Sequence, residues 1–159
     1  MTTAPSTAGI VDAPSWSIRP ERPIDLDQIH HLHREAFGRP DEAELVDAIR
    51  SGPDFLPELS LIAAADDGSV LGHVLVSRIG FEPMEGPGEG THALALAPLA
   101  VLPVHAGRGI GAALTSAALE VADARDAPFV VVLGAPAYYR RFGFVPAADF
   151  GIDGPYADA

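Results

Sequence analysis

Three glycines at alternate positions, Gly107, Gly109 and Gly111, restrict the possible fold more than any other feature of this sequence. They follow an apolar run, residues 93–102, that is typical of a buried strand. They precede residues 112–122, which are small and apolar at helical spacing. A helix that starts in such a turn presents free N–H groups and the positive end of its dipole at one point. The sequence therefore predicts a phosphate-binding turn; a glycine-rich helix entry without a ligand is the alternative.

Two other phosphate-binding motifs fit this turn less well. Gly107, Gly109 and Ala112 satisfy the dinucleotide pattern Gly-x-Gly-x-x-Gly/Ala, but that pattern expects an acidic residue at the end of the next strand. The next strand, residues 129–133, ends in Gly134, and the turn comes late in the chain. A Walker A loop is excluded because no Gly-Lys-Ser/Thr is present.

Length and residue types indicate one globular unit. With 159 residues, 48% of them hydrophobic, the chain can build a single core. Residues 1–15 have no apolar periodicity and are expected to form a mobile tail, so the domain is predicted at 16–159. The sequence has no secretory signal and no membrane-length apolar run, so a cytoplasmic location is expected by default. It has no cysteine, which excludes disulfides and cysteine nucleophiles but does not indicate a compartment.

The charge of the chain argues against one class of partner. A formal net charge of −12, from 22 acidic and 10 basic residues, opposes binding to a phosphate backbone. Nucleic acid is therefore not an expected partner, and neither is a membrane. The same acidity favours solubility first and an attraction for cationic small molecules or basic peptides second.

Apolar periodicity and turn residues predict an α/β (α+β) arrangement of ten elements. In chain order these are a strand at 16–19, a helix capped by Asp25 and ending at Phe37, a helix at 41–50, strands at 59–65, 70–81 and 93–102, a helix after the glycine turn, a strand at 129–133, a helix at 135–142 and the start of a strand at 144–145. The first two long strands are joined by a turn at 66–69. Residues 82–90 are rich in Gly and Pro and are expected to form a loop.

Pro98 lies inside the apolar run 93–102. A proline has no N–H to donate to a central ladder, so the run is expected to contain a bulge or a local splaying at this residue. A simple irregularity at a sheet edge is the alternative.

Two segments together resemble the GNAT acetyltransferase superfamily. Residues 99–114 are similar to its acetyl-CoA motif, commonly written Gln/Arg-x-x-Gly-x-Gly/Ala. Residues 138–144 are similar to its second signature, aromatic-Tyr-x-basic-x-Gly-Phe. The resemblance covers roughly residues 16–145 and implies a mixed central sheet, flanked by about four helices, whose parallel strands splay apart at the cofactor site.

The resemblance assigns roles to residues by position. Backbone groups that would bind the pantetheine arm of acetyl-CoA belong to Leu99, Ala100 and Val101. The phosphate-binding segment comprises Ala106, Gly107, Arg108, Gly109, Ile110, Gly111 and Ala112. Tyr139 occupies the general-acid position, where its phenol would protonate the leaving thiolate; a core tyrosine that caps a helix is the alternative.

Two departures from the family pattern stand out. Ala106 replaces the usual Gln or Arg, which removes a polar side chain but leaves the backbone donors. Few residues follow position 145, so the final strand of the fold is expected to be shortened or supplied differently.

The function implied is an acetyl-CoA-dependent N-acetyltransferase, with acetyl-CoA as co-substrate, that acts on a primary amine of a small molecule or peptide. Direct attack in a ternary complex is expected, and a homodimer is compatible with the sequence. The alternative is a non-catalytic acyl-CoA-binding domain that acts as a sensor or structural partner. Candidate bases are Glu82, Glu85, Glu89 and His92, but none is assigned. His30, His31 and His33 lack the spacing of a metal site, and no metal is expected.

Overall fold

The computed structural model describes residues 15–81 and 91–154. These residues form a five-stranded sheet and four α-helices, with short 3-10 turns between them. The strands are β1 Trp16–Pro20, β2 Ser60–Ala65, β3 Val70–Phe81, β4 Thr91–Val101 and β5 Val130–Val132. The helices are α1 Leu26–Phe37, α2 Asp41–Arg50, α3 Ile110–Asp123 and α4 Pro136–Tyr139.

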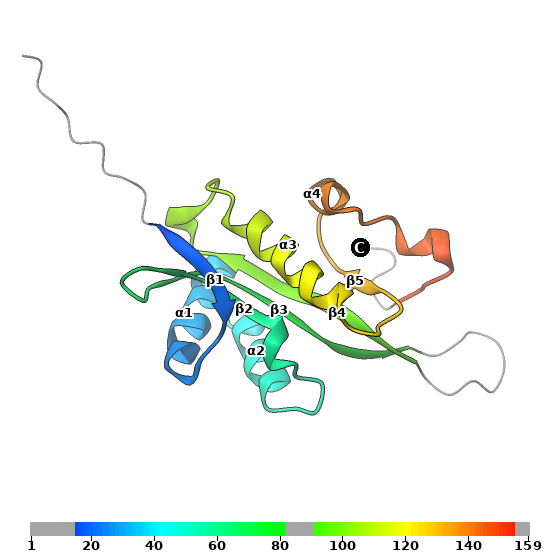
Figure 1. Ribbon diagram of the computed structural model, residues 1–159, viewed down its shortest axis with the longest axis horizontal. Helices are drawn as coiled ribbons and strands as arrows, with labels where there is room; N and C mark the ends of the chain where they lie inside the picture. Colours follow the sequence, from blue (N-terminus) through cyan, green and yellow to red (C-terminus); the bar gives the residue numbers. More distant parts are fainter. Residues whose placement is uncertain (1–14, 82–90, 155–159) are drawn as a thin grey trace, which may run out of the picture.

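The strands lie side by side in chain order, β1-β2-β3-β4-β5. All neighbours are antiparallel except β4 and β5, which are parallel, so the predicted mixed sheet is confirmed. Figure 1 shows three layers, with α3 crossing in front of the sheet and α1 and α2 behind it. In the part of the chain described, no helix has the length and apolar character needed to cross a membrane.

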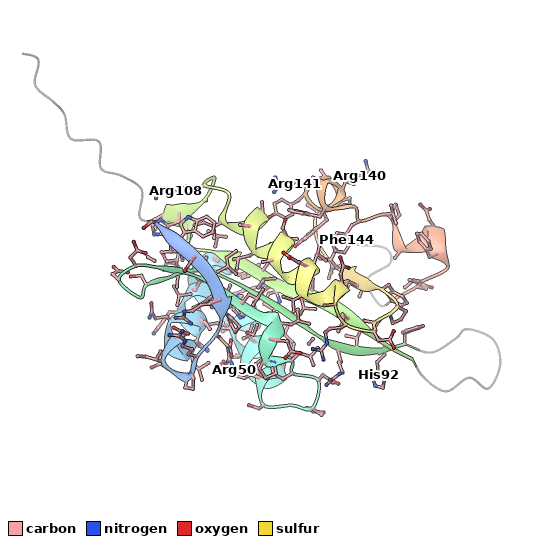
Figure 2. All side chains as sticks on the ribbon, viewed as in Figure 1. Arg50, His92, Arg108, Arg140, Arg141 and Phe144 are labelled. Carbon is pink, nitrogen blue, oxygen red and sulfur yellow. The ribbon has the colours of Figure 1, made fainter. Side chains whose placement is uncertain are left out.

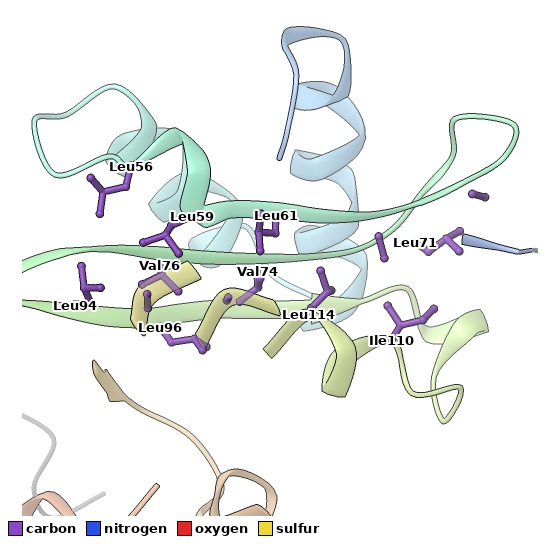
Figure 3. Close-up of a cluster of buried hydrophobic side chains, with 14 residues drawn as sticks. Leu56, Leu59, Leu61, Leu71, Val74, Val76, Leu94, Leu96, Ile110 and Leu114 are labelled. Carbon is purple, nitrogen blue, oxygen red and sulfur yellow. The ribbon is translucent and has the colours of Figure 1, made fainter. Parts of the chain in front are cut away.

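Each face of the sheet carries its own core. The larger core joins α3 to the strands; in Figure 3, Ile110 and Leu114 of α3 lie against strand residues such as Val74 and Leu96. The smaller core joins α1 and α2 to the opposite face. Gly72 on β3 makes close packing of α3 possible, since a β-carbon built there would lie 2.9 Å from Ile110 and from Leu114.

The predicted irregularity at Pro98 is a β-bulge. Val74 of β3 pairs with Leu99, and Val76 pairs with Leu96, so one residue of β3 faces two of β4, Ala97 and Pro98. The peptide bond between these two residues is cis. The extra residue keeps leucine side chains on the α3 face both before and after the bulge.

Most predicted elements are confirmed, and the bounds of α2 and β3 are those predicted. Asp25 is the N-cap residue of α1, as predicted, but its side chain makes no capping hydrogen bond. Its carboxylate instead accepts hydrogen bonds from Arg19 at 2.7 Å and from the backbone N–H of Arg22 at 2.7 Å, which fixes the 3-10 turn that precedes the helix.

The C-terminal elements differ more from prediction. The helix expected at 135–142 is the short α4 followed by a 3-10 turn, Arg140–Phe142. The strand expected at 144–145 is wrong: Phe144 packs edge-on against Tyr139, and Pro146, which has no N–H to donate, leads into another 3-10 turn. The loop predicted at 82–90 and nearly all of the predicted tail lie outside the described residues.

Candidate active site

The glycine turn adopts backbone conformations that other residues avoid. Gly107 and Gly109 have φ values of 74° and 79°, both in the left-handed region. A β-carbon built on either residue would meet nothing within 4 Å, so conformation, and not lack of space, requires glycine there. Gly109 is the N-cap of α3, and its carbonyl accepts the first helical hydrogen bond, from Ala113 at 3.0 Å.

Free donors converge at this turn. The N–H groups of Ile110, Gly111 and Ala112 form the first turn of α3 and have no partner inside the helix. Within the described part of the chain, no backbone carbonyl accepts a hydrogen bond from residues 107–112. Arg108 is exposed beside them, with one guanidinium nitrogen 3.3 Å from His105. The turn thus presents backbone donors, a helix dipole and a positive side chain to an anion.

Strands β4 and β5 separate just before this turn. They pair only from Leu94 with Val130 to Leu96 with Val132, so the last part of β4 has no partner on that side. The Leu102 N–H donates to the backbone carbonyl of Leu71 in β3 at 2.9 Å. Because backbone groups alternate along a strand, Leu99 and Val101 turn theirs toward the open side.

The third predicted strand residue is placed differently. Ala100 turns its backbone toward β3, and its side chain is buried in the core beneath α1. Leu99 and Val101 instead lie on the α3 face. The gap between β4 and β5 is therefore lined by the backbone of two of the three predicted residues, and it leads to the glycine turn.

Tyr139 lies at the end of α4, directly after β5. Its ring packs on Gly134, where a β-carbon would lie 2.5 Å from ring atom Cε2, and it contacts the core on the α3 face. The side chain is half-buried. Burial raises the pKa of the Tyr139 phenol, and Tyr138 raises it further. A phenol with a raised pKa keeps its proton near neutral pH and can act as an acid.

Sequence reasoning missed a second tyrosine at the site. The Tyr138 hydroxyl lies over the first turn of α3, 2.9 Å from a β-carbon built on Gly111. No local pattern could reveal this contact, since it joins residues far apart in the chain. Gly134 was discoverable: a lone glycine that ends an apolar strand indicates close approach by another group.

The candidate bases are not placed at this site. Glu82, Glu85 and Glu89 lie outside the described residues. His92 is exposed at the start of β4, and Figure 2 shows it at the opposite end of the molecule from Arg108. Ala97 of the bulge lies five positions further along the strand, a span of roughly 17 Å.

The histidines of α1 have separate surroundings. His30 pairs with Asp47 of α2 at 2.8 Å, His31 is exposed, and His33 is fully buried. In residues 15–81 and 91–154 there is no group of three or more His, Asp or Glu side chains arranged to hold a metal ion.

His33 belongs to a chain of buried polar side chains on the α1 and α2 face. Its Nε2 lies 2.8 Å from Nδ1 of His73, whose Nε2 lies 2.8 Å from the Ser60 hydroxyl. Ser60 donates to Glu21, which also accepts from Arg50 at 2.6 Å. Since Ser60 donates to Glu21, Nε2 of His73 donates to Ser60. In a neutral His73 ring Nδ1 then accepts from Nε2 of His33, and His33 Nδ1 has no partner among the described residues.

Burial explains the ionisation of this network. It lowers the pKa of His33 to about 3, with neighbouring His73 and Arg50 adding to the effect. It also lowers the pKa of His73, although Glu21 opposes the change. For Glu21, burial alone would raise the pKa, but hydrogen bonds from His73, Arg50 and Ser60 lower it to about 2. His33 therefore stays neutral and Glu21 ionised well into the acid range, and the lowered pKa of His73 favours its neutral ring as well.

Comparison with known proteins agrees with this geometry. Residues 26–144 match the sequence model of the acetyltransferase (GNAT) family, which is more than half of the chain. The chain belongs to the GNAT family. Its GNAT relatives include the uncharacterized N-acetyltransferase YjhQ of Escherichia coli K12, 36% identical over 133 residues, which span 83% of this chain and 71% of YjhQ. The uncharacterized N-acetyltransferase YhbS of the same strain is 38% identical over 131 residues, 82% of this chain and 74% of YhbS.

Solved GNAT structures share the fold. A GNAT family acetyltransferase from Brucella melitensis, in complex with acetyl-CoA, has a TM-score of 0.72 and 35% identity and covers 84% of each chain. Escherichia coli YhbS, in complex with CoA, has a TM-score of 0.75 and 34% identity over 94% of this chain and 75% of YhbS. The predicted GNAT fold is confirmed.

Proposed function

We propose that this chain is an acetyl-CoA-dependent N-acetyltransferase that transfers the acetyl group to a primary amine of a small molecule or peptide. The main support is the arrangement of two sets of free backbone groups. Those of Leu99 and Val101 lie on the open edge of β4, and the free N–H groups at the start of α3 follow directly after this edge. The open edge of β4 can bind an extended arm with amide groups, and the N–H groups at the start of α3 can bind a pyrophosphate. Acetyl-CoA joins both chemistries in one molecule, and two GNAT relatives were solved with acetyl-CoA or CoA.

Tyr139 fits the role of proton donor in this reaction. The amine nitrogen attacks the thioester carbonyl in a ternary complex, the N–C bond forms, and the C–S bond breaks. The departing sulfur takes the phenol proton of Tyr139, the amine passes its own proton to solvent water, and the phenolate then regains a proton from solvent. The half-buried position of Tyr139, next to β5 and the gap, supports this assignment.

CoA binding gives the first prediction. CoA or acetyl-CoA should raise the thermal unfolding temperature, because a ligand that binds only the folded state stabilises it by about 2.7 kcal/mol at a concentration 100 times its Kd. NADH and ATP at the same concentrations should have much smaller effects in differential scanning fluorimetry. A shift with NADH and none with CoA would show that the glycine turn binds another cofactor.

Replacing Gly109 by valine gives the second prediction. The left-handed φ of 79° should cost about 1–2 kcal/mol of folding free energy in any residue with a β-carbon, and CoA affinity should fall as the turn rearranges. Gly38→Val is the matched control, since Gly38 has a φ of 67°, equally open surroundings and a place at the end of α1. It should lose comparable stability in urea unfolding and keep its CoA affinity in calorimetry. Equal affinity in both folded variants would remove this turn from the site.

Ala106 favours a second candidate function, the binding of acyl-CoA without turnover. A domain that binds acyl-CoA without turnover needs the backbone donors but no chemistry, and the exposed Ala106 contributes no polar side chain to the turn. Incubation with acetyl-CoA and a panel of amines, followed by detection of free CoA, distinguishes the two functions. CoA released only in the presence of an amine supports the transferase.

A further inference from the structure

Tyr138 occupies the space that Gly111 leaves open. A β-carbon built on Gly111 would lie 2.9 Å from the Tyr138 hydroxyl and 3.6 Å from a methyl group of Val101. The hydroxyl therefore lies where the end of β4 meets the first turn of α3. The free N–H groups of Ile110, Gly111 and Ala112 belong to this same first turn of α3.

Among the described residues, none forms a hydrogen bond with the Tyr138 hydroxyl. The ring is half-buried between Tyr139, at a centroid distance of 4.9 Å, and Phe142, at 5.5 Å. Packing alone would be served by phenylalanine. A hydroxyl held beside unpaired backbone donors can instead donate to an anion that those donors also bind.

A positive charge lies on the same ring. The guanidinium carbon of Arg141 is 4.2 Å from the centroid of Tyr138, within the range of a cation–π contact. Among the described residues, no carboxylate pairs with Arg141. In Figure 2, Arg108 and Arg141 lie along the same side of the molecule as α4.

This local charge matters because the whole chain is acidic. A formal net charge of −12 repels a polyanion, so a phosphate ligand requires positive charge at its binding point. Arg108 supplies it from the turn. Stacking on Tyr138 holds the side chain of Arg141 on the side of the glycine turn where α4 lies, and this contact leaves the positive charge of Arg141 in place.

We propose that Tyr138 and Arg141 form a clamp that binds the pyrophosphate of the CoA substrate together with the N–H groups at the start of α3. The Tyr138 hydroxyl donates to a phosphate oxygen, and Arg141 orients the ring and adds its charge. The inference rests on the proposed function. The two adjacent tyrosines thereby have different roles. Tyr138 faces α3 and binds phosphate, whereas Tyr139 faces Gly134 and β5.

Calorimetric titration with CoA tests the clamp. Tyr138→Phe should raise the Kd for CoA about tenfold, because it deletes one hydrogen bond to a charged group and keeps the ring. Arg141→Gln should raise it several-fold and reduce its dependence on salt. Arg140→Gln removes an adjacent, exposed arginine without a ring contact and should leave the Kd unchanged. Thermal unfolding of each variant checks that it is folded.

Pantetheine, which lacks the pyrophosphate, separates the possible contacts. Its affinity, followed by ligand-observed NMR, should be the same for wild type and Tyr138→Phe. An equal loss of pantetheine affinity in Tyr138→Phe would show that the hydroxyl binds the pantetheine arm, and it would overturn the clamp. Wild-type CoA affinity in both Tyr138→Phe and Arg141→Gln would also overturn it while leaving the proposed function intact. If the wild-type protein binds no CoA, the proposed function fails, and the clamp fails with it.

Discussion

Tyr139→Phe should lower kcat by about 10²-fold, the lower end of the usual contribution of general acid catalysis. The phenol acts mainly in the transition state, as negative charge builds on the sulfur of the leaving group, so the loss should fall on kcat and kcat/KM together. A thiolate is already a tolerable leaving group, which keeps the effect near 10². Steady-state release of CoA, with an amine that the protein accepts, measures both constants.

Structure and binding provide the controls for this variant. The ring of Tyr139 packs on Gly134 and against Phe144, and phenylalanine keeps both contacts. Thermal stability and CoA affinity should therefore hardly change. Tyr138→Phe should act on the KM for acetyl-CoA. A large loss of kcat in Tyr138→Phe, with none in Tyr139→Phe, would move the acid to Tyr138 and contradict the assignment.

Acid should destabilise the protein from pH 6.5 downward, well above the range in which carboxylates titrate. His33 has a folded-state pKa of about 3 against an ordinary 6.5, so below pH 6.5 the unfolded state takes up a proton that the folded state refuses. Above pH 6.5 the buried His33 does not lower the free energy of unfolding. At pH 5 the proton bound only in the unfolded state should lower this free energy by about 2 kcal/mol. His73, whose pKa is also lowered, acts in the same direction. Glu21 adds a further loss only below pH 4.5, since its folded pKa is about 2.

Urea unfolding at pH 7.5 and pH 5 measures this effect. His33→Gln removes the titrating ring but retains an amide that can donate to His73 Nδ1, so its stability should vary less with pH by about 2 kcal/mol over this interval. His31→Gln is the matched control, because His31 is exposed on the same helix and should leave the slope unchanged. A wild-type unfolding free energy that is constant between the two pH values would contradict the neutral, buried histidine pair.

The sequence predicts those features that local chemistry determines. The turn at residues 66–69 opens β3 and Gly52 follows α2, so both elements have the predicted bounds. Pro98 predicts the bulge because a proline cannot donate to the ladder. The glycine turn was also predictable, since Gly107 and Gly109 adopt the left-handed conformations that favour glycine.

Features that join distant parts of the chain could not be predicted in this way. His33 and His73 are 40 residues apart, and only the packing of α1 on β3 brings them together. The contact of Tyr138 with Gly111 likewise depends on how α4 folds back after β5. The side chain of Asp25 makes no hydrogen bond to α1 because it forms an ion pair with Arg19, a residue that the sequence alone does not place nearby.

The bulge at Ala97 and Pro98 fixes both the core packing and the open backbone edge of β4. If β4 continued past the Leu96–Val76 pair as a regular ladder, Leu99 would pair with His73 and not with Val74. Leu99 and Val101 would then turn away from α3 and Ala100 toward it, and the backbone groups of Leu99 and Val101 would turn toward β3 and away from the gap. For redesign, the bulge is therefore a stricter constraint than the identity of the side chains around it.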